Sequence, residues 1–155
     1  MAADPRIPDP GFTLRHALKI QKRFSDIDVL GHVNNNACLS YFDLGKTQYF
    51  LDVLPPDGHD MHNAKAVIVN INVSFHAPTY FSEPMEVLTG VASVSEHSFI
   101  MEQRIVNTET GEVKSTARSV MVGFHMATAT SRPIGDEWVA ALEKWEGRPL
   151  RKPKE

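Results

Sequence analysis

The sequence predicts an α+β fold in which a single antiparallel sheet encloses one long helix. Two patterns predict it. Residues 34–54 are apolar around most of a helical circumference, which is typical of a helix that is buried on several sides. Four later segments have the length and apolar content of strands and are bounded by turn residues: 69–75, 85–96, 99–106 and 113–125. The helix and these strands are segregated along the chain, as in α+β domains.

The first regular element is a predicted strand from Leu14 to Arg23, in which apolar residues alternate with basic and polar ones. It leads into Asp26 and Asp28 and then into a turn at Gly31. Three asparagines follow at residues 34–36. Asparagine is a favoured N-cap because its side chain accepts a hydrogen bond from a free helical N–H. We therefore expect the long helix to begin within these three residues.

The long helix is expected to end near Leu54, because Pro55 and Pro56 cannot continue it. Its polar residues share one narrow stripe: Asn36, Ser40, Asp43 and Thr47. Gly45 lies inside the helix, where glycine costs about 1 kcal/mol relative to alanine. We therefore expect a neighbouring backbone to approach closely at Gly45.

The predicted sheet follows the helix in the chain. In residues 69–75 the side chains alternate between apolar and polar, so one side of this strand faces the core. Short turns, one of them ending at Gly111, join the last three strands into an antiparallel meander. One sheet covers a helix only partly, and unpaired edge strands are a liability, so we expect at least a homodimer.

The two ends of the chain are predicted to lie outside the core. Residues 1–12 contain three prolines and no periodicity, so we expect a flexible tail. Residues 13–147 form the single domain. It ends with a short helix capped by Asp136, with an apolar face made of Trp138, Leu142 and Trp145. Residues 148–155 are mostly charged, and we expect a frayed C-terminal tail.

The composition is that of an ordinary globular protein. Of 155 residues, 42% are hydrophobic and 23% are charged, which argues against a disordered chain. The net charge of −3, without a run of basic residues, argues against binding to nucleic acid or to a membrane surface. Cys38 is the only cysteine, so no intrachain disulfide forms, and neither a signal peptide nor a membrane span is expected. We therefore expect a cytoplasmic protein.

A candidate site lies where Asp28 precedes the long helix. A helix N-terminus has free backbone N–H groups and carries about half a positive charge. A carboxylate beside such donors is the arrangement that acyl transfer needs, because the donors stabilise the developing oxyanion. The alternative is that Asp26 and Asp28 are ordinary turn residues and that Asn34 is only a cap.

Other catalytic arrangements have little support. The sequence has no G-x-S-x-G, no Walker-type loop and no G-x-G-x-x-G. Among seven histidines, His59 and His62 form the close pair, but no further ligands complete a tetrahedral set, so no metal is expected. His32 shares the turn with Asp28; it either orients substrate or water, or only hydrogen-bonds the turn. We expect Cys38 to be a small buried side chain rather than a nucleophile.

Three runs of residues carry a resemblance to a known family: Phe24-Ser25-Asp26-Ile27-Asp28, Gly31-His32-Val33-Asn34-Asn35 and Leu39-Ser40-Tyr41-Phe42-Asp43. They resemble the acyl-CoA thioesterases of the 4-hydroxybenzoyl-CoA thioesterase class, in the hotdog superfamily. Weaker similarity extends over residues 14–126. The resemblance implies an antiparallel sheet wrapped around one long helix, homodimers that join two sheets edge to edge and often pair into homotetramers, and active sites at the dimer interface.

The resemblance also implies hydrolysis of an acyl-CoA thioester to a free acid and coenzyme A. By position, Asp28 matches the catalytic carboxylate, which acts as nucleophile or as general base, and His32 matches a supporting histidine. Val33, Asn34 and Asn35 match the substrate-binding turn, in which the Asn35 N–H polarises the thioester carbonyl. No metal or cofactor is implied, because coenzyme A is part of the substrate.

The sequence leaves open the acyl group and two alternative functions. Cys38 stands where this branch of the family usually has an aromatic residue, so the preferred acyl group is undetermined. A non-catalytic module that binds acyl-CoA or an acyl carrier would use the same pocket without turnover. A dehydratase of the same fold is a weaker alternative, because the Asp-x-Asp-x-x-Gly-His pattern is not typical of that class.

Overall fold

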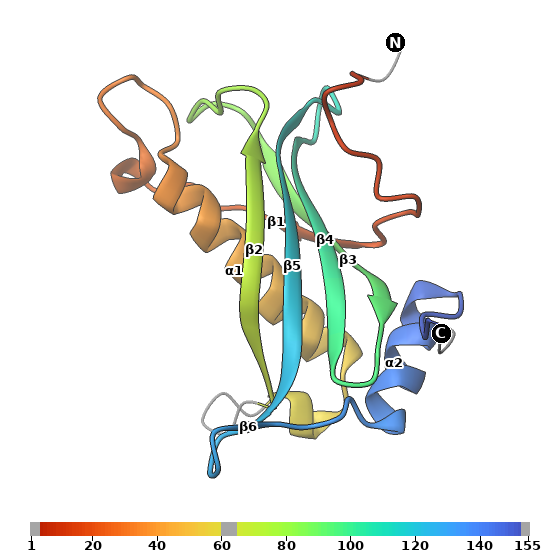
Figure 1. Ribbon diagram of the computed structural model, residues 1–155. Helices are drawn as coiled ribbons and strands as arrows, with labels where there is room; N and C mark the ends of the chain where they lie inside the picture. Colours follow the sequence, from red (N-terminus) through yellow and green to blue (C-terminus); the bar gives the residue numbers. More distant parts are fainter. Residues whose placement is uncertain (1–3, 60–64, 153–155) are drawn as a thin grey trace.

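The computed structural model describes residues 4–59 and 65–152, and it has one antiparallel sheet curled around one long helix (Figure 1). The elements in chain order are β1 (His16–Lys19), η1 (Phe24–Asp26), α1 (Asn35–Val53), η2 (Pro56–His59), β2 (Ala66–Phe75), β3 (Met85–Val94), β4 (Ser98–Asn107), β5 (Val113–His125), β6 (Thr130–Ser131) and α2 (Asp136–Glu146). The sheet order is β1-β3-β4-β5-β2, and β6 pairs with β5. The predicted α+β class is confirmed.

The predicted meander is confirmed, with element boundaries close to the expected ones. β3, β4 and β5 pair antiparallel in sequence, and β1 pairs with β3. β1 is shorter than predicted and ends at Lys19, although the Ile20 N–H still donates to the Met85 carbonyl. β2 begins earlier than predicted, at Ala66. A bulge in β2 interrupts the register at Val69, whose side chain is 59% exposed.

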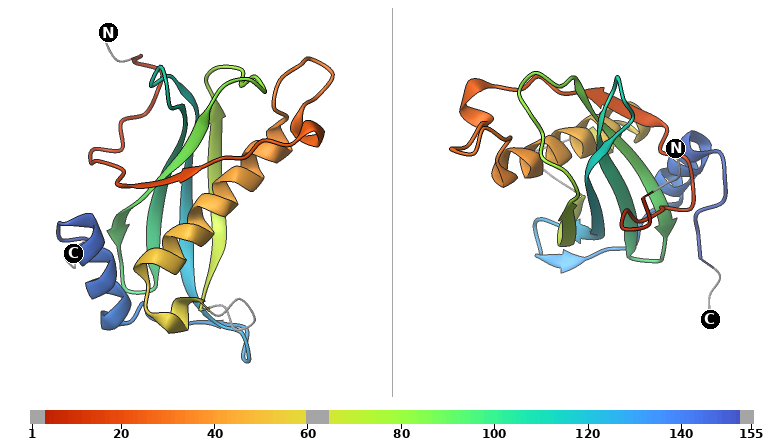
Figure 2. Two further views of the ribbon diagram at one scale, coloured as in Figure 1. Left: turned by 180° about the vertical axis from the view of Figure 1, so that it is seen from behind. Right: turned by 90° about the horizontal axis from the view of Figure 1, so that it is seen from above.

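The long helix α1 crosses one face of the sheet (Figure 2) and buries one side of its own surface. Its inner side includes Phe42 and Tyr49, which are fully buried and belong to two separate hydrophobic clusters. Its outer side carries Leu44 and Leu51, which are exposed. The sheet of a single chain therefore covers α1 on one side only. No helix in the described part of the chain is long and apolar enough to cross a membrane.

Gly45 lies where α1 contacts the middle of the sheet. A Cβ atom at this position would lie 2.6 Å from Val87 Cγ1, 3.0 Å from Gln103 Nε2 and 3.1 Å from Thr89 Oγ1. The expected close approach therefore exists, but it is made by side chains of β3 and β4 and not by a backbone. The Gln103 amide also donates to the Phe42 carbonyl, so a hydrogen bond ties α1 to this point of the sheet.

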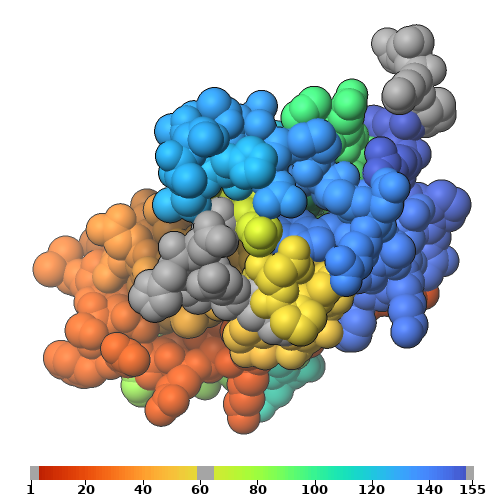
Figure 3. All heavy atoms as spheres, turned by 90° about the horizontal axis from the view of Figure 1, so that it is seen from below, coloured from red at the N-terminus to blue at the C-terminus, as the bar shows by residue number. Residues whose placement is uncertain are grey.

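The predicted C-terminal helix exists as α2, but its N-cap is Gly135 rather than Asp136. Asp136 is the first helical residue, where a carboxylate suits the helix dipole, and its side chain pairs with Arg151 at 2.7 Å. Seen from below, the segment that contains α2 lies against the end of α1 and η2 (Figure 3), where the indole N–H of Trp138 donates to Asp57.

Residues 148–152 are not a frayed tail, contrary to the expectation from their charge. Leu150 is 3% exposed, its N–H donates to the Glu143 carboxylate, and its carbonyl accepts the Val94 N–H. Arg151 forms a parallel bridge with Val94. One buried leucine and a short backbone pairing with β3 therefore fix this segment.

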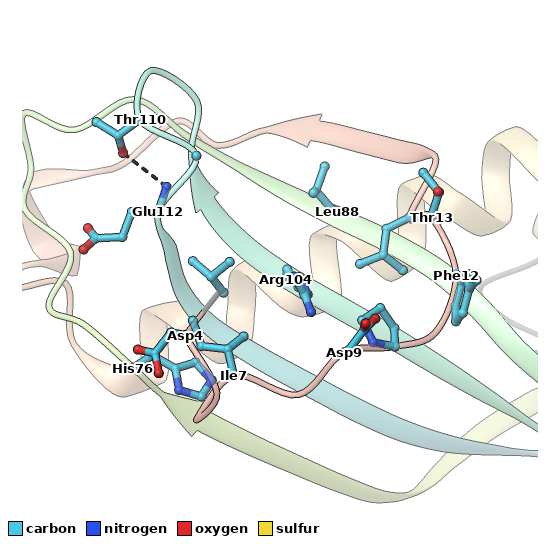
Figure 4. Close-up of a pocket in the computed structure, with 14 residues that line it drawn as sticks. Asp4, Ile7, Asp9, Phe12, Thr13, His76, Leu88, Arg104, Thr110 and Glu112 are labelled. Atoms are coloured by element: carbon cyan, nitrogen blue, oxygen red, sulfur yellow. Dashed lines mark hydrogen bonds between the residues drawn. The ribbon is translucent and has the colours of Figure 1, made fainter. Parts of the chain in front are cut away.

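The N-terminal segment, residues 4–14, crosses the face of the sheet opposite α1 (Figure 4). Phe12 lies in the groove left by Gly90, with the Arg148 guanidinium 4.1 Å from its ring centroid. Under this segment lies a cavity of about 890 Å³, which is lined by apolar side chains and by charged groups of both signs. None of the site residues predicted from the sequence lines this cavity.

Candidate active site

Asp26 holds together the turn that joins β1 to α1. Its Oδ2 accepts the Arg23 N–H at 3.0 Å and the Tyr41 hydroxyl at 2.6 Å. Its carbonyl accepts the Asn34 N–H at 2.8 Å. The backbone and the side chain of Asp26 therefore both tie the turn to the first turns of α1.

Asp28 is half-buried two residues later, in a tight turn of its own. Its Oδ1 accepts the N–H of Leu30 at 2.9 Å and the N–H of His32 at 3.3 Å, and its N–H donates to the His32 carbonyl at 2.8 Å. Gly31 completes the turn with a φ of +80°, a conformation that favours glycine. Among the described residues, no group donates a hydrogen bond to Oδ2, so one oxygen of this carboxylate is free.

The N-terminus of α1 lies beside this turn. Asn34 is the N-cap, which lies within the predicted residues 34–36, and its Oδ1 accepts the Ala37 N–H at 2.7 Å. Asn35 is the first helical residue, so no carbonyl of the helix is placed to accept its N–H. The Asn35 N–H and the positive end of the helix dipole therefore remain available to an electron-rich atom.

The loop that follows β2 closes the other side of the site. The Val33 N–H donates to the Thr79 carbonyl at 2.8 Å, and the His32 ring meets the Tyr80 ring edge-on, with the centroids 5.2 Å apart. This loop and the turn before α1 project from the same end of the molecule (Figure 1). They enclose one space between them.

That space is an open cavity of about 740 Å³. All five residues predicted for the site line it: Asp28, His32, Val33, Asn34 and Asn35. The structure therefore brings the predicted residues together. Its wall also contains three polar residues that the sequence analysis did not single out: Thr79, Lys114 and Ser115.

Lys114 is a buried residue of β5 that binds the loop after β2. It is 4% exposed, and its Nζ pairs with Glu83 at 2.8 Å and with Glu112, and donates to the Pro78 carbonyl at 3.1 Å. Burial lowers the pKa of Lys114, but hydrogen bonds to the two carboxylates outweigh it and leave the pKa raised. The sequence could have suggested Glu112 as a partner of Lys114, because the two residues are close in the chain. It could not have suggested Glu83, which comes from a different part of the chain.

Cys38 also lines the cavity and is 5% exposed. Burial, and after it the negative charge of Asp26, raise the pKa of the thiol to about 11. The group is therefore a neutral thiol at physiological pH, which fits a wall residue better than a nucleophile. In residues 4–59 and 65–152, no three His, Cys, Asp or Glu side chains are grouped to hold a metal ion. His62 of the predicted close pair lies outside these residues.

The geometry suits attack on a carbonyl carbon. A carboxylate and a backbone N–H at a helix start line the same cavity, and in the part of the chain that the structure describes one carboxylate oxygen and this N–H have no partner. The carboxylate can attack a carbonyl carbon or take a proton from water, and the N–H can stabilise the charge that develops on the carbonyl oxygen.

Comparison with known proteins identifies the family of the chain. A family model described as the thioesterase-like superfamily matches residues 23–143. The long-chain acyl-CoA thioesterase FadM of Escherichia coli (strain K12) is 24% identical over 126 residues, which cover 81% of this chain and 96% of FadM.

Solved structures agree with the match. A thioesterase from Thermus thermophilus, complexed with coenzyme A and Zn, is 26% identical with a TM-score of 0.75, covering 86% of this chain and 96% of that chain. A predicted thioesterase from Bacillus stearothermophilus is 26% identical with a TM-score of 0.76, covering 86% and 97% of the two chains. The hotdog fold and the thioesterase resemblance inferred from the sequence are confirmed. The chain belongs to the thioesterase-like superfamily.

Proposed function

We propose that the protein is an acyl-CoA thioesterase, which hydrolyses a thioester to a free acid and coenzyme A. The observation that carries the proposal is the cavity lined by both Asp28 and Asn35; within the described residues the Asp28 Oδ2 and the Asn35 N–H have no hydrogen-bond partner. Membership of the thioesterase-like superfamily supports the reaction class. The similarity to FadM, a long-chain acyl-CoA thioesterase, supports an acyl-CoA substrate.

Asp28 starts the reaction in one of two ways. As a nucleophile, it adds through Oδ2 to the thioester carbon; the C–S bond then breaks, coenzyme A leaves as thiolate, and water hydrolyses the mixed anhydride. As a general base, it takes a proton from water while the water oxygen adds to the thioester carbon, and the C–S bond then breaks. In both routes the Asn35 N–H and the helix dipole stabilise the oxyanion. Because a thiol has a pKa of about 8.5, the thiolate leaves without a dedicated general acid.

The other residues of the turn position these groups. The His32 ring lies in the cavity wall against Tyr80 and orients the substrate or the water. Val33 is buried and bonded to Thr79, and the Asn34 cap fixes the first turn of α1, so together they hold the Asn35 N–H in place. No step requires a metal or a cofactor.

We also propose that the chain associates with itself as a homodimer or a homotetramer. β2 is an edge strand, paired on one side with β5 and unpaired on its other side in the described part of the chain. Exposed apolar side chains lie on β2 and on the outer side of α1: Ile68, Val69 and Phe75, with Leu39, Leu44 and Leu51. Pairing two copies of β2 would remove the open edge and shield apolar surface from water. Light scattering on the purified protein tests this; a monomer at micromolar concentration would contradict it.

Thiol release from a panel of short, long and aromatic acyl-CoAs tests the activity, with wild type and Asp28→Asn measured side by side. Asparagine keeps the shape of Asp28 but can neither attack nor accept a proton. We expect Asp28→Asn to lower kcat by about 10²- to 10⁴-fold, with circular dichroism and Tm unchanged. Near-normal turnover by Asp28→Asn would show that another residue does the chemistry.

The same panel distinguishes the competing function. If no acyl-CoA releases thiol but acyl-CoA still binds, for example by calorimetry, the protein is a non-catalytic binding module or acts on a thioester of a carrier protein. A carboxylate with a free oxygen at a helix N-terminus favours the enzyme, because an anion adds nothing to the binding of an uncharged acyl group.

A further inference from the structure

Ser115 is a buried polar side chain in the cavity wall whose hydroxyl has no partner. It is 2% exposed, and in the described residues nothing donates to or accepts from its Oγ. It lines the same cavity as Asp28 and Asn35. A buried hydroxyl without a hydrogen bond destabilises the fold. A ligand in the cavity that offered a hydrogen bond to this hydroxyl would remove that cost.

The strand register fixes the face of the sheet on which the Ser115 side chain lies. Ser115 lies opposite Phe75 on β2 and opposite Ile105 on β4, and Ile105 is buried in the core cluster beside α1. Paired residues share a face of the sheet, so Ser115 faces α1. Cys38, on α1, lines the same cavity and has a neutral thiol, a weak hydrogen-bonding group.

A hydrocarbon chain in this cavity would leave the Ser115 hydroxyl unpaired, since neither methylene groups nor the Phe75 ring offer a strong acceptor. An acyl group that carries an oxygen would satisfy it. Sites built to hydrogen-bond a substrate oxygen reject analogues that lack it far more strongly than apolar pockets reject an added group. The position of one serine therefore bears on which acyl groups the site prefers.

We propose that Ser115 is a specificity-determining residue that hydrogen-bonds an oxygen substituent on the acyl group. The preferred substrates are then acyl-CoAs with a hydroxyl or keto oxygen on the acyl part, in place of the unsubstituted acyl-CoAs of equal length. The inference rests on the proposed thioesterase function and adds the substrate class to it.

The test uses matched substrates and two matched variants. The substrates are pairs that differ by one oxygen: butanoyl- and 3-hydroxybutanoyl-CoA, octanoyl- and 3-hydroxyoctanoyl-CoA, octanoyl- and 3-oxooctanoyl-CoA, and benzoyl- and 4-hydroxybenzoyl-CoA. The variants are Ser115→Ala and Ser119→Ala. Ser119 is the matched control. It lies on the same face of β5, is 1% exposed and is also unpaired among the described residues. Unlike Ser115, it does not line the cavity.

We expect the wild type to favour the oxygenated member of at least one pair in kcat/KM by about tenfold or more. Ser115→Ala should abolish that preference by lowering kcat/KM for the oxygenated member alone, and Ser119→Ala should leave the ratio unchanged. Equal rates for both members of every pair in the wild type, or an equal loss for both members in Ser115→Ala, would overturn the proposal. The wild-type ratios decide the matter even if Ser115→Ala does not fold. Absence of thiol release from every substrate would instead count against the proposed function itself.

Discussion

The hydroxyl of Tyr41 donates a 2.6 Å hydrogen bond to the carboxylate of Asp26, two residues before the Asp28 carboxylate that lines the cavity. Burial, and then this hydrogen bond, raise the pKa of Tyr41, so the hydroxyl stays protonated and remains the donor. The two aspartates of the Asp-x-Asp pair therefore differ: Asp26 joins the turn to α1, and Asp28 keeps one oxygen free.

Asp26→Ala should destabilise the protein. The Tyr41 hydroxyl and the Arg23 N–H both lose their acceptor, so we expect the free energy of unfolding to fall by about 1–3 kcal/mol. Urea denaturation measures the change. Tyr41→Phe removes the donor of the hydrogen bond between Tyr41 and Asp26 and should lower the free energy of unfolding by about 1 kcal/mol. If Asp26→Ala were as stable as wild type and yet lost all turnover, the assignment of the two aspartates would be reversed.

Gly45→Ala tests the contact between α1 and the sheet. Alanine favours the helix by about 1 kcal/mol, but its Cβ would lie 2.6 Å from Val87 Cγ1. Val87 is fully buried and β-branched, so its side chain has little room to rotate away. We expect a net loss of about 1–3 kcal/mol in the free energy of unfolding. Adding Val87→Ala should make the Gly45 substitution less costly; a stabilised Gly45→Ala would show that the sheet can move away.

The sequence predicts those parts of the fold and of the site that depend on residues close together in the chain. The asparagine cap at Asn34 sets the start of α1 at Asn35, within the expected residues 34–36. The five predicted site residues all lie between Asp28 and Asn35, so a single turn is enough to bring them into one cavity. The meander is predictable for a similar reason, since short turns place successive strands side by side.

Contacts between distant segments explain what the sequence could not predict. Leu150 is buried because Glu143 and Val94 bind its backbone, which no pattern within residues 148–155 reveals. Lys114 is a charged residue in a strand, yet it is buried because Glu83 and the Pro78 carbonyl reach it from the loop after β2. The Ser115 hydroxyl is unpaired among the described residues, and the cavity that Ser115 lines is formed by three distant segments: the turn before α1, the loop after β2, and β5.

The ion pair between Lys114 and Glu83 predicts how stability depends on pH. Burial raises the pKa of Glu83, but hydrogen bonds from Lys114, the Tyr80 N–H and Asn107 outweigh it and leave the pKa below its ordinary value of 4.5. A carboxylate with a lowered folded-state pKa stabilises the fold above its unfolded pKa, and this contribution is lost as the pH falls through the folded-state pKa. The pKa of Lys114 is raised, so Lys114 acts at the alkaline end of the pH range. Its contribution to stability is complete below its ordinary pKa of 10.5 and is lost as the pH rises through its folded-state pKa.

We therefore expect the free energy of unfolding to fall with acid below about pH 5, and to fall less steeply in Glu83→Gln. Urea denaturation across a series of pH values measures the slopes. Asp136→Asn is the matched control, because the Asp136–Arg151 pair is exposed on both sides and should contribute little. If Glu83→Gln and wild type showed the same slope, other carboxylates would control the acid transition.

Cys38 should resist alkylation as long as the protein is folded. Its thiol is 5% exposed and has a pKa of about 11, and only the thiolate reacts with iodoacetamide. We expect labelling at about pH 8 to be at least about 100-fold slower in buffer than in urea, with the mass shift measured over time. Because the chain has one cysteine, the unfolded protein is its own reference. Equally fast labelling in both conditions would mean that reagent and base reach Cys38 through the cavity, and the thiol would then need to be reconsidered as a reactive group.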